Sequence, residues 1–328
     1  MKDFVSPIGI EFTYQAPKSR VNRWIKSMPR LTVSSAQYAL SQLAEEKGLD
    51  TWHISPDGDD WDKQECAIEI ATPILYSPQQ LFKWYDKWNS ILQTTPFKAT
   101  WHSFYKPGQC WYGSGGGHIH ATIPFKTIRK KALFLLNVMR FVADKPWLNW
   151  VFNEWCDVDN ANSFLSLDPL DWYDIQYIMR KRMQDLAGEK IFRLFIVDGK
   201  GIDSIKDAKL VLKSMLWKHF AINYREDADD IEFRFFDAPS SFKQVEDHVD
   251  IVTGIMEYCK RMTAQGVHIP SVGYHSLEEM IKRENLDSVP KVAQRLKDFC
   301  RQLNLSYERY VPYLKNMRER LSEEEKLT

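Results

Sequence analysis

The chain has 328 residues, 44% of them hydrophobic and 13% aromatic, so it can bury a large core in one big domain or two. Lysine and arginine total 44, as do aspartate and glutamate, so no overall charge draws it to nucleic acid or an anionic membrane. The first residues lack a signal-peptide core, and no apolar stretch is long enough to span a bilayer. We therefore expect a globular protein without a membrane segment.

The number and spacing of the cysteines indicate that the protein resides in a reducing compartment. There are 5, an odd number, scattered along the chain without a Cys-x-x-Cys pair. This pattern argues against a disulfide scaffold and against a zinc ribbon. We expect a cytoplasmic location.

Apolar patterning predicts strands and helices in mixed order. The predicted strands cover residues 4–14, 52–55, 66–72, 97–105, 117–124, 190–197 and 231–236. The predicted helices cover residues 34–47, 77–92, 127–144, 204–222 and 242–265, and a charged helical segment starts at residue 276. Residues 146–189 are rich in tryptophan and are interpreted as an insertion or lid. A boundary near Pro270 would leave residues 271–328 as a helical C-terminal extension.

Three predicted strands carry polar side chains within apolar runs, and in two of them the polar residues are spaced by two. Alternation along a strand puts His118 and His120 on one face, and likewise Glu232 and Arg234, while Glu11 is the acid of its own strand. Buried unpaired charges cost several kcal/mol, so such residues usually pair with one another, bind a metal or face a polar cavity.

The pair His118 and His120 fits a structural role as well as a metal site. Two imidazoles side by side are common ligands, but no further Cys or His lies close in sequence, so acids would have to complete the site. The candidate acids are Glu11, Glu65, Glu69 and Glu232, each of which taken singly also fits a surface or salt-bridged residue. The glycines of residues 113–117 lack the Lys-Ser/Thr of a phosphate loop and suit a flexible turn that could fold over a ligand.

Several of these motifs, in their order along the chain, resemble the amidoligase family, carboxylate-amine ligases of the glutamine synthetase and glutamate-cysteine ligase superfamily. The motifs span about residues 8–238, and the C-terminal tail is not part of the resemblance. They are Gly9-Ile-Glu11-Phe, the segment from Asp57 to Pro73 with Glu69-Ile-Ala-Thr-Pro73, Gly117-His118-Ile-His120, Asn223, and Ile231-Glu232-Phe-Arg234-Phe.

The resemblance implies an α+β fold, with a curved antiparallel sheet, helices on its outer face, and a concave face that binds ATP and two or three Mg²⁺ or Mn²⁺ ions. Residues 1–270 would form the catalytic domain. Glu11, His118 and Glu232 match the ligands of the metal among the ATP phosphates. Glu65 and Glu69 match the acids for a metal on the carboxylate side.

The remaining roles also come from the resemblance. Arg234 matches the arginine that meets the transferred phosphoryl group, and His120 would lie near the substrate or phosphate. Asp57, Asn223 and Arg225 are further candidate contacts to the substrate or phosphate. The family often has Glu-x-Glu on the first strand, whereas the second position here is Thr13, which leaves the number of metal ions open.

The expected activity is ATP-dependent formation of an amide bond between a small-molecule or peptide carboxylate and an amine. Two alternatives stay open: another reaction on the same fold, such as amide hydrolysis or phosphotransfer, and a binding protein that holds ATP and metal without turnover. The substrates and the oligomeric state are not readable from the sequence. A nucleic-acid partner has slight support from Arg180, Lys181 and Arg182 near the tryptophans.

Overall fold

The structure, a computed structural model, describes residues 3–28, 36–56, 65–97, 117–143, 145, 147–152, 194–195, 198–214, 222–234, 236, 239, 241–270 and 289–315. The fold is α+β, which confirms the predicted class. Six strands form a sheet in the order β2-β3-β1-β4-β6-β5. The pairs β1–β3, β2–β3 and β5–β6 are antiparallel. The strands are β1 (Ile8–Pro17), β2 (His53–Pro56), β3 (Glu65–Ala71), β4 (Gly117–Thr122), β5 (Ile222–Arg225) and β6 (Asp230–Phe233).

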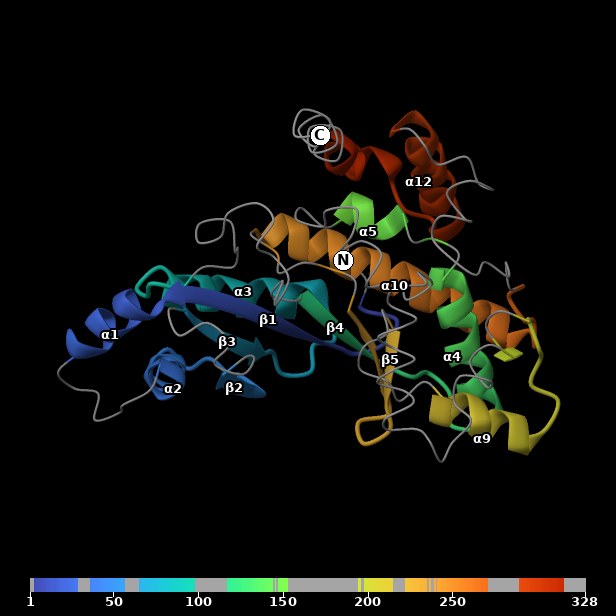
Figure 1. Cartoon of the computed structure of the whole chain (residues 1–328), viewed down its shortest axis with the longest axis horizontal. Helices are drawn as coiled ribbons and strands as arrows, with labels where there is room; N and C mark the ends of the chain where they lie inside the picture. The colour runs from blue at the N-terminus through green and yellow to red at the C-terminus, as the bar shows by residue number, and fades with distance from the viewer. Residues whose placement is uncertain are drawn as a thin grey trace. The chain divides into compact units, whose positions relative to one another are not determined.

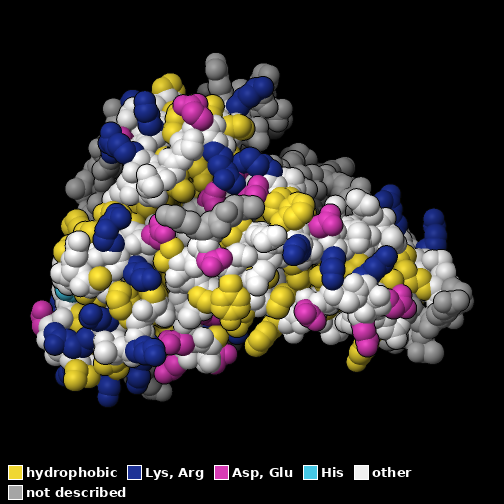
Figure 2. Space-filling model, turned by 180° about the vertical axis from the view of Figure 1, so that it is seen from behind, with side chains coloured by type: hydrophobic (Ala, Val, Ile, Leu, Met, Phe, Trp, Pro, Cys, Tyr) yellow, Lys and Arg dark blue, Asp and Glu magenta, His cyan; other side chains and the backbone are white. Residues whose placement is uncertain are grey.

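Helices occupy much of the rest of the described chain (Figure 1). They are α1 (Lys18–Lys26), α2 (Ala36–Glu46), α3 (Pro78–Leu92), α4 (Ile128–Ala143), α5 (Trp147–Phe152), α9 (Ile205–Ser214), α10 (Phe242–Ala264) and α12 (Val289–Leu303), with a short 3-10 helix at Tyr307–Arg309. Among the described residues, no helix combines the length and the apolar character needed to cross a membrane. Side chains of both charge signs are interspersed on the face shown in Figure 2, in keeping with the balanced composition.

The chain divides into two compact units. The first unit comprises Met1–His120 and Phe236–His248, and the second comprises Ala121–Phe235 and Val249–Thr328. The domain boundary predicted near residue 270 does not coincide with the limits of these two units, and it stays a prediction.

In the first unit, α3 covers one face of β1. Alternation along β1 directs Phe12 and Tyr14 to the same side, where Phe12 stacks on Trp84 at 5.8 Å between ring centroids and Tyr14 meets Trp88 at 5.7 Å. The helix begins where Ser77 accepts a hydrogen bond from the backbone N–H of Gln80, and Pro78 occupies the first turn. Aromatic packing on one face of β1 leaves the opposite face for polar side chains.

In the second unit, α12 packs against α4. The rings of Phe141 on α4 and Phe299 on α12 stack with 5.9 Å between centroids. The buried guanidinium of Arg140 donates hydrogen bonds to the backbone carbonyls of Phe195, Lys200 and Ile269 and so fixes three connecting segments. The described part of the predicted C-terminal extension therefore shares a core with the helices before it.

Most predicted strands and helices within the described residues are present, with ends shifted by a few residues. Three of the described elements were not predicted: α1, α5 and β5. The residues of α5 belong to the segment that was interpreted as an insertion or lid. The nine residues of α1 bury only Val21 and Trp24, so their apolar pattern is weak, and Trp24 is held by edge contact with the ring of Phe97 at 6.1 Å. The helix predicted to reach residue 222 is described as α9 over Ile205–Ser214, and Ile222 belongs to strand β5 instead.

Candidate functional site

Strand pairing in the first unit gathers acids on the polar face of the sheet. Glu11 and Thr13 point away from α3, and the antiparallel register places Thr13 opposite Glu69 of β3. Glu69 therefore lies on the same face as Glu11. Glu65, four residues before Glu69 in β3, has its backbone paired with Pro17 of β1.

Two histidines of β4 face the carboxylate of Glu11. His118 Nδ1 lies 3.3 Å from Glu11 Oε2, and His120 Nε2 lies 3.2 Å from Glu11 Oε1. All three side chains are between 10% and 13% exposed. The prediction that His118 and His120 share a face is confirmed, and each oxygen of Glu11 has an imidazole beside it.

The surroundings of Glu11 favour its ionised form. Burial alone would raise the pKa of this carboxyl group, but the hydrogen bond from His118, the close approach of His120 and the charge of both imidazoles outweigh it, so the pKa of Glu11 lies well below its ordinary value. An ionised carboxylate with little access to water is a strong attractor for a cation.

This lowered pKa predicts a pH-dependent contribution to stability. A carboxyl group whose folded pKa is below its unfolded pKa stabilises the fold above the unfolded value and loses that contribution as the pH falls through the folded value. In metal-free buffer, wild type should therefore exceed Glu11→Gln in free energy of unfolding at pH 7, with the difference shrinking as the pH falls below the ordinary carboxyl range. Urea denaturation of both proteins at several pH values measures it, and a difference that stays constant down to pH 3 would contradict the assigned interactions.

Glu11, Glu69 and His118 together could hold a metal ion. Their candidate donor atoms all lie within 4.8 Å of one another. Carboxylate oxygens are the preferred protein ligands of Mg²⁺, and imidazole nitrogen is a common ligand of transition metals such as Mn²⁺ and Zn²⁺. The donor set thus fits a divalent cation. Its composition differs from the sequence expectation, which assigned Glu69 to a different ion from Glu11 and His118.

One member of this neighbourhood was not predicted. His53 of β2 places Nε2 2.9 Å from Glu69 Oε1. His53 shares its strand face with Ser55, and Ser55 is the register partner of Glu69. A histidine in a short predicted strand was visible in the sequence, but only the pairing of β2 with β3 shows which acid it meets.

The second unit contains a polar cluster on β5 and β6. Asn223 and Glu232 are register partners, and Asn223 Nδ2 donates a hydrogen bond of 2.9 Å to Glu232 Oε2. The guanidinium of Arg234 forms an ion pair with Glu232 Oε1. Glu232 and Asn223 are buried, at 4% and 6% exposure, whereas Arg234 retains some exposure. The shared face predicted for Glu232 and Arg234 is confirmed.

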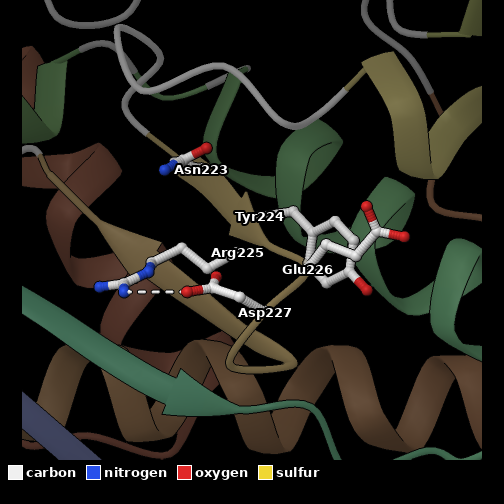
Figure 3. A pocket seen from close by; sticks show the side chains of 5 residues that line it. All are labelled: Asn223, Tyr224, Arg225, Glu226 and Asp227. Carbon is white, nitrogen blue, oxygen red and sulfur yellow. Dashed lines mark ion pairs between the residues drawn. The ribbon is translucent and has the colours of Figure 1, made fainter.

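Asn223 also lines a cavity of about 570 Å³ along β5, together with Tyr224, Arg225, Glu226 and Asp227 (Figure 3). Arg225 Nη2 lies 3.5 Å from Asp227 Oδ2. Because an ionised carboxylate only accepts hydrogen bonds, Glu232 fixes the amide nitrogen of Asn223 toward itself. Asn223 Oδ1 is buried and has no hydrogen-bond partner among the described residues.

Each unit, taken by itself, thus brings together several of the predicted site residues. Glu11, Glu69, His118 and His120 come together in the first unit, and Asn223, Glu232 and Arg234 come together in the second. Binding of one ion by Glu11, His118 and Glu232 would join residues of both units and stays a prediction. Asp57 lies outside the described residues, as does the predicted lid apart from α5, and the side chain of Glu65 is not described either.

Comparison with known proteins gives no family assignment. No protein-family model matches the chain, and no curated protein matches it.

Proposed function

We propose that the chain is an ATP-dependent carboxylate-amine ligase on a glutamine synthetase-like sheet, with an acyl phosphate as its intermediate. The observation that carries the proposal is the convergence of Glu11, Glu69 and His118 on one sheet face in the first unit. The family resemblance implies a metal-binding role for each of these three residues. Their donor types fit the Mg²⁺ or Mn²⁺ that accompanies ATP.

The proposed reaction has two steps. The γ-phosphoryl group of ATP passes to an oxygen of the acid substrate and ADP leaves; the amine nitrogen then attacks the acyl carbon, loses a proton and expels phosphate. The bound cation would neutralise charge on the phosphate oxygens. Glu11, Glu69 and His118 would hold it there, and the low pKa of Glu11 keeps one anionic ligand ready at neutral pH.

The cluster of the second unit suits contact with the transferred phosphoryl group. Arg234 presents a planar guanidinium, which can bond two oxygens of a phosphoryl group at once. Glu232 forms an ion pair with this guanidinium, and Asn223 donates a hydrogen bond to Glu232. These two contacts fix the orientation of the Arg234 side chain.

Trapping with hydroxylamine tests the reaction class. Hydroxylamine can replace the amine, because it attacks an acyl phosphate and yields a stable hydroxamate. With ATP, Mg²⁺, hydroxylamine and a panel of amino acids and other carboxylic acids, at least one acid should give hydroxamate together with ADP and phosphate. The ferric complex of the hydroxamate is measured by its colour, and the nucleotides are separated by chromatography.

The nucleotide product distinguishes the alternatives. Release of AMP and pyrophosphate would identify an adenylating ligase instead. ADP without hydroxamate for every acid of the panel would identify an ATPase or a phosphotransferase, and ATP binding without any product would identify a binding protein. Each of these outcomes contradicts the proposed ligase. Reactions without acid, and reactions with Glu11→Gln protein, control for hydrolysis by contaminating enzymes.

A further inference from the structure

We propose that His53 is a positioning residue that holds Glu69 in place to bind the divalent cation. This inference rests on the metal role proposed for Glu11, Glu69 and His118. Neither the motifs of the sequence nor the family resemblance included His53, which comes from β2, a strand that supplies no predicted ligand.

The contact between His53 and Glu69 is short and involves one carboxylate oxygen. His53 Nε2 lies 2.9 Å from Glu69 Oε1, which is the length of a good N–H···O hydrogen bond. When Glu69 is ionised its oxygens can only accept, so Nε2 must be the donor. A carboxylate accepts at both oxygens, and a bond at Oε1 therefore leaves the group able to bind a cation.

His53 contacts one of the candidate metal ligands but is not one of these ligands itself. The donor atoms of Glu11, Glu69 and His118 lie within 4.8 Å of one another, and His53 does not belong to that group among the described residues. Its role is therefore to act on Glu69, which in turn contacts the ion. Hydrogen bonds of this kind orient metal ligands, and their loss commonly lowers metal affinity about 10- to 100-fold.

The side chain of Glu69 is more exposed than that of Glu11. Glu11 is held by two imidazoles and is 12% exposed, whereas the side chain of Glu69 is 20% exposed. A glutamate side chain has several rotatable bonds, and ordering it on binding costs rotamer entropy. The hydrogen bond from His53 orders the side chain of Glu69 before the cation binds. The backbone of His53 is itself held in place by the pairing of β2 with β3.

The test is Mn²⁺ binding by the metal-free full chain, measured as Kd by calorimetry and by electron paramagnetic resonance. His53→Phe should weaken Mn²⁺ binding about tenfold. His53→Gln carries an N–H donor at a similar reach and should recover most of the lost affinity. Trp52→Phe, at the adjacent and 71% exposed position, is the matched control and should bind as wild type does.

The melting temperature separates positioning from a structural role. His53 is about one-third exposed, so all three variants should melt within a few degrees of wild type without metal. Wild-type affinity in His53→Phe, or equal weakening in His53→Gln and His53→Phe, would overturn the proposal while leaving the metal role of Glu11 intact. Absence of Mn²⁺ binding in the wild type would overturn both.

Discussion

Replacing Glu11 with glutamine is expected to abolish divalent-cation binding almost completely. Glu11 is 12% exposed, its low pKa keeps it ionised, and it lies in the donor group with Glu69 and His118. Glutamine keeps the size of the side chain and loses the negative charge. Because loss of an outer partner already costs about 10- to 100-fold in affinity, loss of a direct anionic ligand should cost about 100-fold or more.

The measurement is calorimetric titration of metal-free protein with Mn²⁺. Glu46→Gln, the same substitution at an exposed position near the end of α2, is the control and should bind Mn²⁺ as wild type does. If Glu11→Gln folds poorly, Glu69→Gln at a more accessible position provides the same test with a smaller structural cost. Unchanged Mn²⁺ affinity in both folded variants would remove this cluster from the metal site.

Replacing Arg234 with lysine is expected to lower ligase turnover by about two orders of magnitude or more, with a much smaller change in ATP affinity. Lysine keeps the positive charge but loses the planar fork that can bond two phosphoryl oxygens, and it cannot reproduce the guanidinium geometry toward Glu232. Removal of one preorganised group that stabilises transition-state charge typically costs about 100- to 1,000-fold in kcat.

Hydroxamate formation gives the turnover, and equilibrium titration gives the Kd of ATP in the presence of Mg²⁺. Arg301→Lys is the matched control, since Arg301 lies on α12 with 81% of its side chain exposed and should tolerate the change. Normal turnover in Arg234→Lys would show that the guanidinium does not act on the phosphoryl group. Equal losses in turnover and ATP affinity would point to ATP binding as its role.

The elements that could be predicted from sequence are those with strong local signals. Ser77 followed by Pro78 marks the beginning of α3, and the recurrence of Leu81, Trp84 and Trp88 along the helix gives its buried face. Strand alternation likewise put His118 and His120 on one face. These features depend on neighbours within a few residues, which is why a single sequence is enough to find them.

Short elements with a weak pattern could not be predicted. The four residues of β5 form a strand because they pair with β6, and Asn223 is fixed by its bond to Glu232 across that pairing. In the sequence, Ile222 and Tyr224 are equally compatible with the end of a helix. Tertiary hydrogen bonds, and not local propensity, determine that these residues form a strand.

The sequence by itself determined the α+β class, the faces that carry polar side chains and the residue types available for a metal site. Which of those residues meet was decided by strand register. Glu11 lies 107 positions from His118 in the chain, and Glu69 meets His53 across another strand pair. A shift of one residue in β3 would turn Glu69 to the opposite face, and long-range pairing sets this register through the packing of side chains on both faces of the sheet.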